Sequence, residues 1–135
     1  MAAADNKRIL QAAFAALETG DGRPFGECMA DDISWTIIGT TPWSRTYSGK
    51  TVVQRELFRP LFAQFADRYT NRALRFIAED DYVVVECRGQ STTKSGQAYN
   101  NSYCYVCRFA NGQMVELTEY LDTALVEKAL APPGV

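Results

Sequence analysis

The sequence predicts an α+β fold, with helices at the front of the chain and a mainly antiparallel sheet behind them. Near the start, apolar residues recur at helical spacing, at Leu10, Ala13, Phe14 and Leu17. Further along, four runs rich in β-branched and aromatic residues are separated by short polar or glycine-containing turns. Helices followed by a series of strands are typical of the α+β class.

The front half predicts three helices and one strand. A glycine-rich turn ends the first helix, and Pro24 suits the first turn of a second, short helix. A strand is expected over residues 33–38, followed by a long aromatic loop over 39–49. Thr51 and Gln54 have the spacing of a capping box, which predicts the start of a third helix.

The back half predicts four strands in a meander and a closing helix. The Asn111-Gly112 step lies between the last two strand-like runs and is the strongest hairpin signal in the chain. The expected strands cover residues 70–78, 82–92, 99–110 and 113–121, and the helix covers 123–130.

Length and composition predict one domain over residues 1–135 and exclude several classes of partner. The net charge is −2, with acidic and basic residues interspersed, which argues against nucleic acid or an anionic membrane as a partner. No apolar run reaches the roughly 18 residues of a membrane span, and the first residues lack the apolar core of a secretion signal. We therefore expect a cytoplasmic protein.

The chain contains no histidine, which limits the chemistry that it could perform. Ser-His and Cys-His nucleophilic sites and the common zinc sites are excluded. The spacing of Cys104 and Cys107 resembles a redox or metal motif, but residues three apart on a strand point to opposite faces. We expect no metal and no cofactor, so acid–base chemistry needs a carboxylate, tyrosine, cysteine or lysine with a shifted pKa.

Glu119 is the candidate general acid or base. On the expected last strand it shares a face with Val115, Leu117 and Leu121, so a carboxylate is set into an apolar row. Burial of a carboxylate is costly unless it is paired, and burial alone raises its pKa. The alternative is a structural role, with Glu119 tied to an arginine or a hydroxyl group.

Two neighbouring strands supply further candidates. Asn101, Tyr103 and Tyr105 share one face of the preceding strand, which could lie beside Glu119 and offer hydrogen bonds to a ligand. Glu86 and Arg88 share a face of the strand before that, and could pair with each other or with Glu119. Alternation alone does not tell which face of that strand is buried.

Three segments resemble the SnoaL-like, ketosteroid-isomerase-related branch of the nuclear transport factor 2-like superfamily. They are residues 96–103, 108–113 and 119–123, and the order of elements fits along the whole chain. The resemblance implies a cone-shaped roll, in which N-terminal helices pack on a strongly curved sheet that encloses a pocket. It also implies a homodimer. The superfamily includes isomerases, polyketide cyclases, dehydratases and limonene-type epoxide hydrolases, beside proteins that only bind or dimerise.

A comparison of single positions with the catalytic residues of these enzymes narrows the activities that the resemblance implies. The base of ketosteroid isomerase falls near Gly39 or Thr40, neither of which can serve, so classical ketosteroid isomerisation is not expected. One aspartate of the limonene-type hydrolases corresponds to Glu119. Their Arg-x-Asp pair corresponds to the segment 86–88 here, with the order of charges reversed.

Together these observations predict a protein that binds a small hydrophobic molecule, with cofactor-free acid–base catalysis as the leading hypothesis. Glu119 or Glu86 would be the acid or base, and Arg88 would tune it. Asn101, Tyr103 and Tyr105 would donate hydrogen bonds. The expected apolar wall is Trp35, Trp43, Tyr47, Leu57 and Phe62. The alternative is a non-catalytic dimeric ligand-binding or scaffold module.

Overall fold

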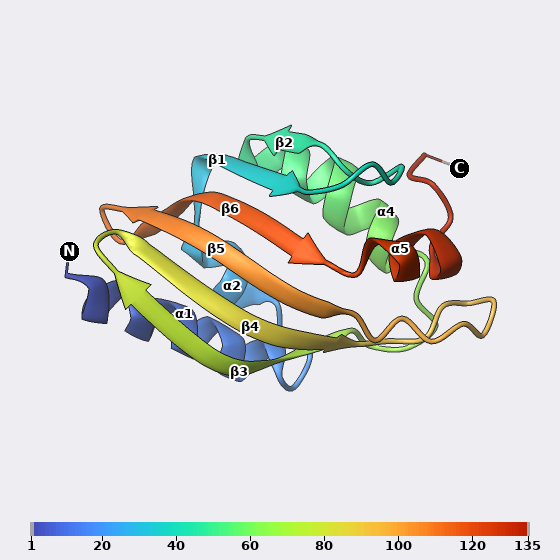
Figure 1. Cartoon of the computed structure of the whole chain (residues 1–135), viewed down its shortest axis with the longest axis horizontal. Coiled ribbons are helices and arrows are strands. Elements are labelled where there is room, and N and C mark those ends of the chain that lie inside the picture. The colour runs from blue at the N-terminus through green and yellow to red at the C-terminus, as the bar shows by residue number, and fades with distance from the viewer. Residues whose placement is uncertain (1, 135) are drawn as a thin grey trace.

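Six strands form one curved sheet in the computed structural model, which describes residues 2–134 (Figure 1). The spatial order is β2-β1-β6-β5-β4-β3. The strands are β1 Met29–Ile37, β2 Thr46–Ser48, β3 Thr70–Glu79, β4 Tyr82–Gln90, β5 Ser102–Ala110 and β6 Gln113–Leu121. The helices are α1 Ala3–Leu17, α2 Arg23–Cys28, α3 Lys50–Val52, the π-helix η1 Val53–Phe58, α4 Arg59–Phe62 and α5 Thr123–Ala129. The α+β class is confirmed.

The meander from β3 to β6 is antiparallel throughout, and β1 joins it by pairing in parallel with β6. Burial alternates along β4 and β5, because one face of the sheet packs on the helices while the other faces outward. The predicted hairpin turn lies between β5 and β6, and both Asn111 and Gly112 have positive φ there, at 52° and 75°. This is the conformation that an Asn-Gly turn favours.

The helices cover the inner face of the sheet in two groups (Figure 1). α1 packs on β3, β4 and α2, and η1 and α4 continue α3, which packs on β1. Phe14 of α1 is the centre of an aromatic cluster, with its ring 5.8 Å from the rings of Phe25 and Phe76 and 6.3 Å from that of Tyr105. The front helices are therefore held to the sheet by apolar burial.

The third helix differs from the prediction in two ways. It begins at Lys50, after Gly49 turns the chain with φ 96°, and no side chain caps it. The predicted capping box is therefore wrong, because the helix has its N-cap at Gly49, two residues before Thr51. The π-helix lies just before Pro60, whose missing N–H cannot bond the carbonyl four residues back.

Two strand boundaries also differ. β1 begins at Met29, four residues earlier than expected, and the short strand β2 lies inside the segment 39–49 predicted as loop. β2 pairs with β1, with Tyr47 opposite Trp35, so the loop folds back as an edge strand. Among the described residues, no helix is long and apolar enough to cross a membrane.

Candidate functional site

A pocket of about 640 Å³ lies between the inner face of the sheet and the helices. Its volume is within the range of small-molecule sites. Several of its lining residues are exposed and mark its opening; these are Gly22, Arg23, Glu27, Gln54 and Phe62. Most of the remaining lining residues are aromatic or aliphatic.

Glu119 lies in the wall of this pocket and is only 7% exposed. It sits on β6 between two neighbours, with Ile37 of β1 on one side and Tyr105 of β5 on the other. The indole nitrogen Nε1 of Trp35 donates a hydrogen bond to Glu119 Oε1 over 2.9 Å. Trp35 reaches this carboxylate because both residues project from the inner faces of adjacent strands.

Burial raises the pKa of Glu119 to about 7, although the hydrogen bond from Trp35 acts in the opposite direction. Within residues 2–134, no lysine or arginine forms a salt bridge with this carboxylate. The arginine partner of the structural alternative is therefore not found, and the indole of Trp35 is the group that bonds this carboxylate. A carboxyl group with this pKa exchanges its proton near neutral pH.

The predicted pairing of Glu119 with Glu86 or Arg88 is wrong. On β4 the inward residues are Val83, Val85 and Cys87, so Glu86 and Arg88 point to the outer face. Glu86 instead forms an ion pair with Arg75 of β3 over 2.5 Å, and Arg88 is exposed. The two residues cannot take part in chemistry inside the pocket.

The structure places most of the other predicted residues at the pocket. Its lining includes Trp35, Trp43, Leu57, Phe62, Tyr103 and Tyr105. Tyr47 and Asn101 are buried but are not lining residues. The Tyr47 hydroxyl donates to the backbone carbonyl of Trp43 over 2.8 Å. Tyr47 therefore supports the backbone of a lining residue without lining the pocket itself.

Asn101 has a structural role between β5 and α5. Its Nδ2 donates to the hydroxyl of Tyr99 and to the backbone carbonyl of Asp122, each over 3.1 Å. Its Oδ1 accepts from the backbone N–H groups of Ser102 and Asp122. All of its hydrogen-bonding groups are used, so it has none left for a ligand.

Two pocket tyrosines, Tyr69 and Tyr99, were not among the predicted site residues. Burial raises the pKa of Tyr99 to about 12, and raises the pKa of Tyr69, Tyr103 and Tyr105 above the usual value for tyrosine. All four hydroxyls are therefore neutral near pH 7 and can act as hydrogen-bond donors. Tyr99 lies on the same side of the expected strand as Asn101 and Tyr103, so the same alternation, extended two residues before Asn101, would have identified it.

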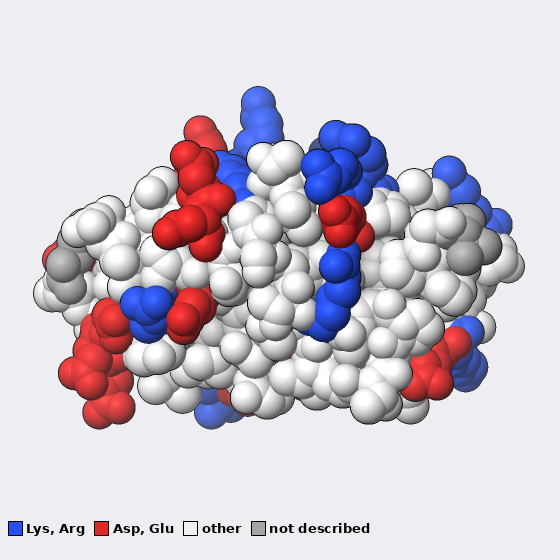
Figure 2. Space-filling model, turned by 90° about the horizontal axis from the view of Figure 1, so that it is seen from above, with Lys and Arg blue, Asp and Glu red and all other residues white. Residues whose placement is uncertain are grey.

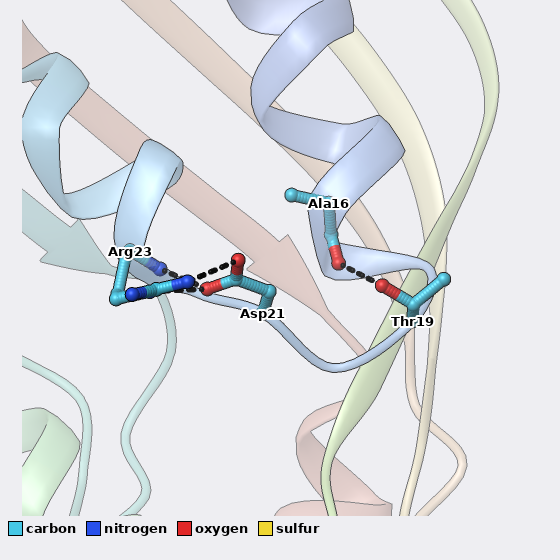
Figure 3. A network of polar contacts seen from close by, with 4 residues as sticks. All are labelled: Ala16, Thr19, Asp21 and Arg23. Carbon is cyan, nitrogen blue, oxygen red and sulfur yellow. Dashed lines mark hydrogen bonds and ion pairs between the residues drawn. The ribbon is translucent and has the colours of Figure 1, made fainter.

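The opening carries charge of both signs. One rim is the turn between α1 and α2, where Arg23 donates to Asp21 from its backbone nitrogen and from its guanidinium over 3.1 to 3.2 Å (Figure 3). Next to it, the Thr19 hydroxyl bonds the carbonyl of Ala16 at the end of α1. On the face of the molecule seen from above in Figure 2, charged side chains stand in small groups of both signs between uncharged surface, and no broad patch of one sign is present.

Comparison with known proteins identifies relatives along the whole chain. A SnoaL-like domain matches residues 10–117. An NTF2-like protein of unknown function from Burkholderia pseudomallei has a TM-score of 0.80 at 23% identity, over 97% of this chain and 100% of that chain. A putative SnoaL-like polyketide cyclase from Jannaschia sp. has a TM-score of 0.77 at 18% identity, over 96% and 94%.

TerC, a protein co-crystallised with polyporic acid, has a TM-score of 0.77 at 16% identity, over 92% of this chain and 96% of that chain. No protein of curated function matches the sequence. The SnoaL-like match covers most of the chain, and the structural neighbours share its arrangement of helices on a curved sheet. The chain belongs to the SnoaL-like family, and it shares its fold with NTF2-like proteins.

Proposed function

We propose that this protein binds a small, largely hydrophobic molecule in its pocket and transfers a proton to or from it through Glu119. The observation that carries this proposal is a buried carboxyl group with a pKa of about 7, facing an apolar pocket of about 640 Å³. Catalytic carboxylates are tuned in this way by removal from water, and structural carboxylates are more often paired with a cation.

The chemistry follows from the surroundings of the carboxyl group. In its ionised form, Glu119 can take a proton from a carbon made acidic by a nearby carbonyl or similar group; in its protonated form it can return one. Trp35 holds one oxygen by its N–H, which leaves the other oxygen for the reaction. Tyr105, directly opposite on β5, contributes a neutral hydroxyl to the same wall.

The names of two structural neighbours support this class of ligand. One is a putative SnoaL-like polyketide cyclase, and the other was co-crystallised with polyporic acid, an organic molecule. Isomerisation, cyclisation, dehydration and opening of an epoxide all need a positioned acid or base. The cytoplasmic location stays a prediction.

A generic substrate tests the base without knowledge of the natural ligand. 5-Nitrobenzisoxazole opens when a base removes its ring C–H proton: the C–H and N–O bonds break, the base is protonated, and a coloured cyanophenolate forms. We expect turnover to rise with pH around a midpoint of about 7, as Glu119 ionises. Glu119→Gln should abolish it, because an amide cannot accept the proton.

Glu86→Gln is the matched control, because Glu86 is a glutamate of the same sheet that faces outward and pairs with Arg75. It should leave the rate and the pH midpoint unchanged. Equal rates in wild type and Glu119→Gln, or no turnover in the wild type, would contradict the role of base. Binding of the probe without turnover would leave only the ligand-binding part of the proposal.

The second candidate is a non-catalytic dimeric module, which the outer face of the sheet favours. Four large apolar side chains are more than 40% exposed on β3, β4 and β6: Leu74, Ile77, Tyr82 and Tyr120. A second copy of the chain could cover them. Light scattering of the purified protein should then give the mass of two chains, and Ile77→Asp should reduce it to that of one.

A further inference from the structure

One end of the pocket differs from the rest because it is built from polar side chains that are removed from water. We call it the tyrosine end; it consists of Tyr69, Asn71, Tyr99 and Tyr103, all of which line the pocket. Asn71 lies opposite Gly89 across β3 and β4. A Cβ on Gly89 would come within 2.9 Å of both the Tyr69 hydroxyl and the Tyr103 ring, so the rings converge over this glycine.

Asn71 has a hydrogen-bond acceptor that no described residue uses. The residue is 2% exposed, and its Nδ2 donates to the Tyr69 hydroxyl over 3.1 Å. Its Oδ1 is buried and has no partner within residues 2–134. A buried carbonyl without a hydrogen bond is costly, so a ligand group that donates to it gains more than a surface contact would give.

The neighbouring hydroxyls retain protons to donate. The Tyr69 oxygen accepts from Asn71, and the Tyr99 oxygen accepts from Nδ2 of Asn101 over 3.1 Å. The hydroxyls of Tyr69 and Tyr99 also interact with that of Tyr103. These two contacts use at most two of the three hydroxyl hydrogens, so at least one hydrogen is left for a ligand acceptor. The tyrosine end therefore offers one free acceptor and at least one donor side by side, which matches a hydroxyl group that both donates and accepts.

The charges around this end select a neutral group. Its four side chains are neutral, and the only cations of the described pocket lining, Arg23 and Lys50, belong to α2 and α3 and not to β3–β5. The negative charge of Glu119 acts on Tyr69, Tyr99 and Tyr103 and disfavours further negative charge among them. An anionic ligand group would be desolvated here with no positive charge to balance it.

We propose that the tyrosine end recognises a neutral hydroxyl group of the ligand, which donates to Asn71 Oδ1 and accepts from a tyrosine hydroxyl. This inference rests on the proposed function, since it concerns the same pocket. It names the substrate class as a hydroxylated hydrophobic molecule, such as a phenol, an enol or a ring alcohol.

The register of the sheet also sets the length of that molecule. Glu119 lies in the same cross-strand row as Tyr105 and Val85, whereas Asn71 lies in the row of Gly89, four residues further along β4. Four residues of strand span about 13 Å, and the three strand spacings from β6 to β3 add about 14 Å across the sheet, so a ligand that touches both ends is elongated, as two or three rings are.

The test compares two probes on one skeleton, 4-hydroxybiphenyl and 4-methoxybiphenyl, by calorimetry or fluorescence at about pH 6, where a phenol with a pKa near 10 is neutral. Only the first can donate a hydrogen bond. We expect the wild type to bind 4-hydroxybiphenyl roughly tenfold more tightly than the ether, as one buried hydrogen bond allows. Asn71→Leu should bind both, with that ratio reduced to about one.

Asn6→Leu is the matched control. Asn6 is also 2% exposed, and its Oδ1 has no partner among the described residues, but it lies on α1 and does not line the pocket. Its variant should retain the tenfold ratio. If Asn71→Leu does not fold, as judged by its thermal melt, Asn71→Ala carries the same expectation.

The outcomes separate the two proposals. Equal affinity of the wild type for both probes, a preference for the ether, or an unchanged ratio in the Asn71 variants would overturn this inference and leave the pocket as a binding site. Binding of neither probe would overturn both this inference and the proposed function.

Discussion

Replacing Glu119 with glutamine should stabilise the protein at alkaline pH. The pKa of this carboxyl group is about 7 in the folded state against 4.5 in the unfolded state. Between these values the folded protein binds more protons, so stability is fully present below about pH 4.5 and is lost as pH rises through 7. Glutamine cannot ionise, and its carbonyl can still accept the Trp35 hydrogen bond.

The size of the effect follows from the same two values. A separation of 4.5 from about 7 corresponds to about 3 kcal/mol of unfolding free energy lost at pH 8, and to less than about 1 kcal/mol at pH 5. Glu119→Gln should therefore exceed the wild type by about 3 kcal/mol at pH 8 and nearly match it at pH 5. Urea unfolding followed by tryptophan fluorescence measures both.

Glu116→Gln serves as the control, because Glu116 lies on the same strand but faces outward and pairs with Arg108. Its carboxyl pKa is lowered by that pair, so its loss should not stabilise the protein at pH 8. If Glu119→Gln were less stable than the wild type at pH 8, or if the difference did not change with pH, the assignment of a buried, unpaired carboxylate would be refuted.

Two further substitutions test the walls of the site. Gly89→Ala should destabilise the fold by about 1–3 kcal/mol, because the new Cβ would collide with two pocket tyrosines. Gly26→Ala is the control: a Cβ at Gly26 meets nothing within 4 Å, so this variant should be as stable as the wild type or more stable. Thermal melts of both variants measure the difference. Trp35→Phe removes the hydrogen bond that favours the ionised carboxylate, so the pKa of Glu119 should rise above its wild-type value. If the titration midpoint of Glu119 were the same in Trp35→Phe as in the wild type, the indole would have no effect on this carboxyl group.

The sequence predicted the back of the fold better than the front. The boundaries of β6 agree with the expected strand, which a glycine turn precedes. A bulge at Val115 interrupts the alternation near the start of β6, so Met114 and not Val115 is buried there, but the alternation holds from Glu116 to Tyr120. That same alternation placed Glu119 and the tyrosines of β5 on the inner face. In the front half, residues 46–48 were expected to be loop, because their pairing with β1 is a tertiary contact that local pattern does not reveal.

The polar end of the pocket could not be predicted from pattern alone. Phe76 and Ala78 show which face of β3 is buried. A register shift between Ala73 and Arg75 then changes which residues point inward in the part of β3 that precedes it. Counting back from Phe76 would place Thr70, and not Asn71, on the inner face. On β4, apolar and charged residues alternate without a sequence signal for the buried side, so Glu86 and Arg88 stayed candidates until the structure placed them outside.

The pKa of Glu119 is the quantity on which the account depends most directly. It can be measured by ¹³C NMR of protein labelled at the glutamate carboxyl carbons, with Glu119→Gln to assign the signal. We expect one carboxyl resonance, absent from Glu119→Gln, to titrate at about 7. A midpoint near 4.5 would show that water or a cation reaches this group, and would contradict the proposed acid–base role.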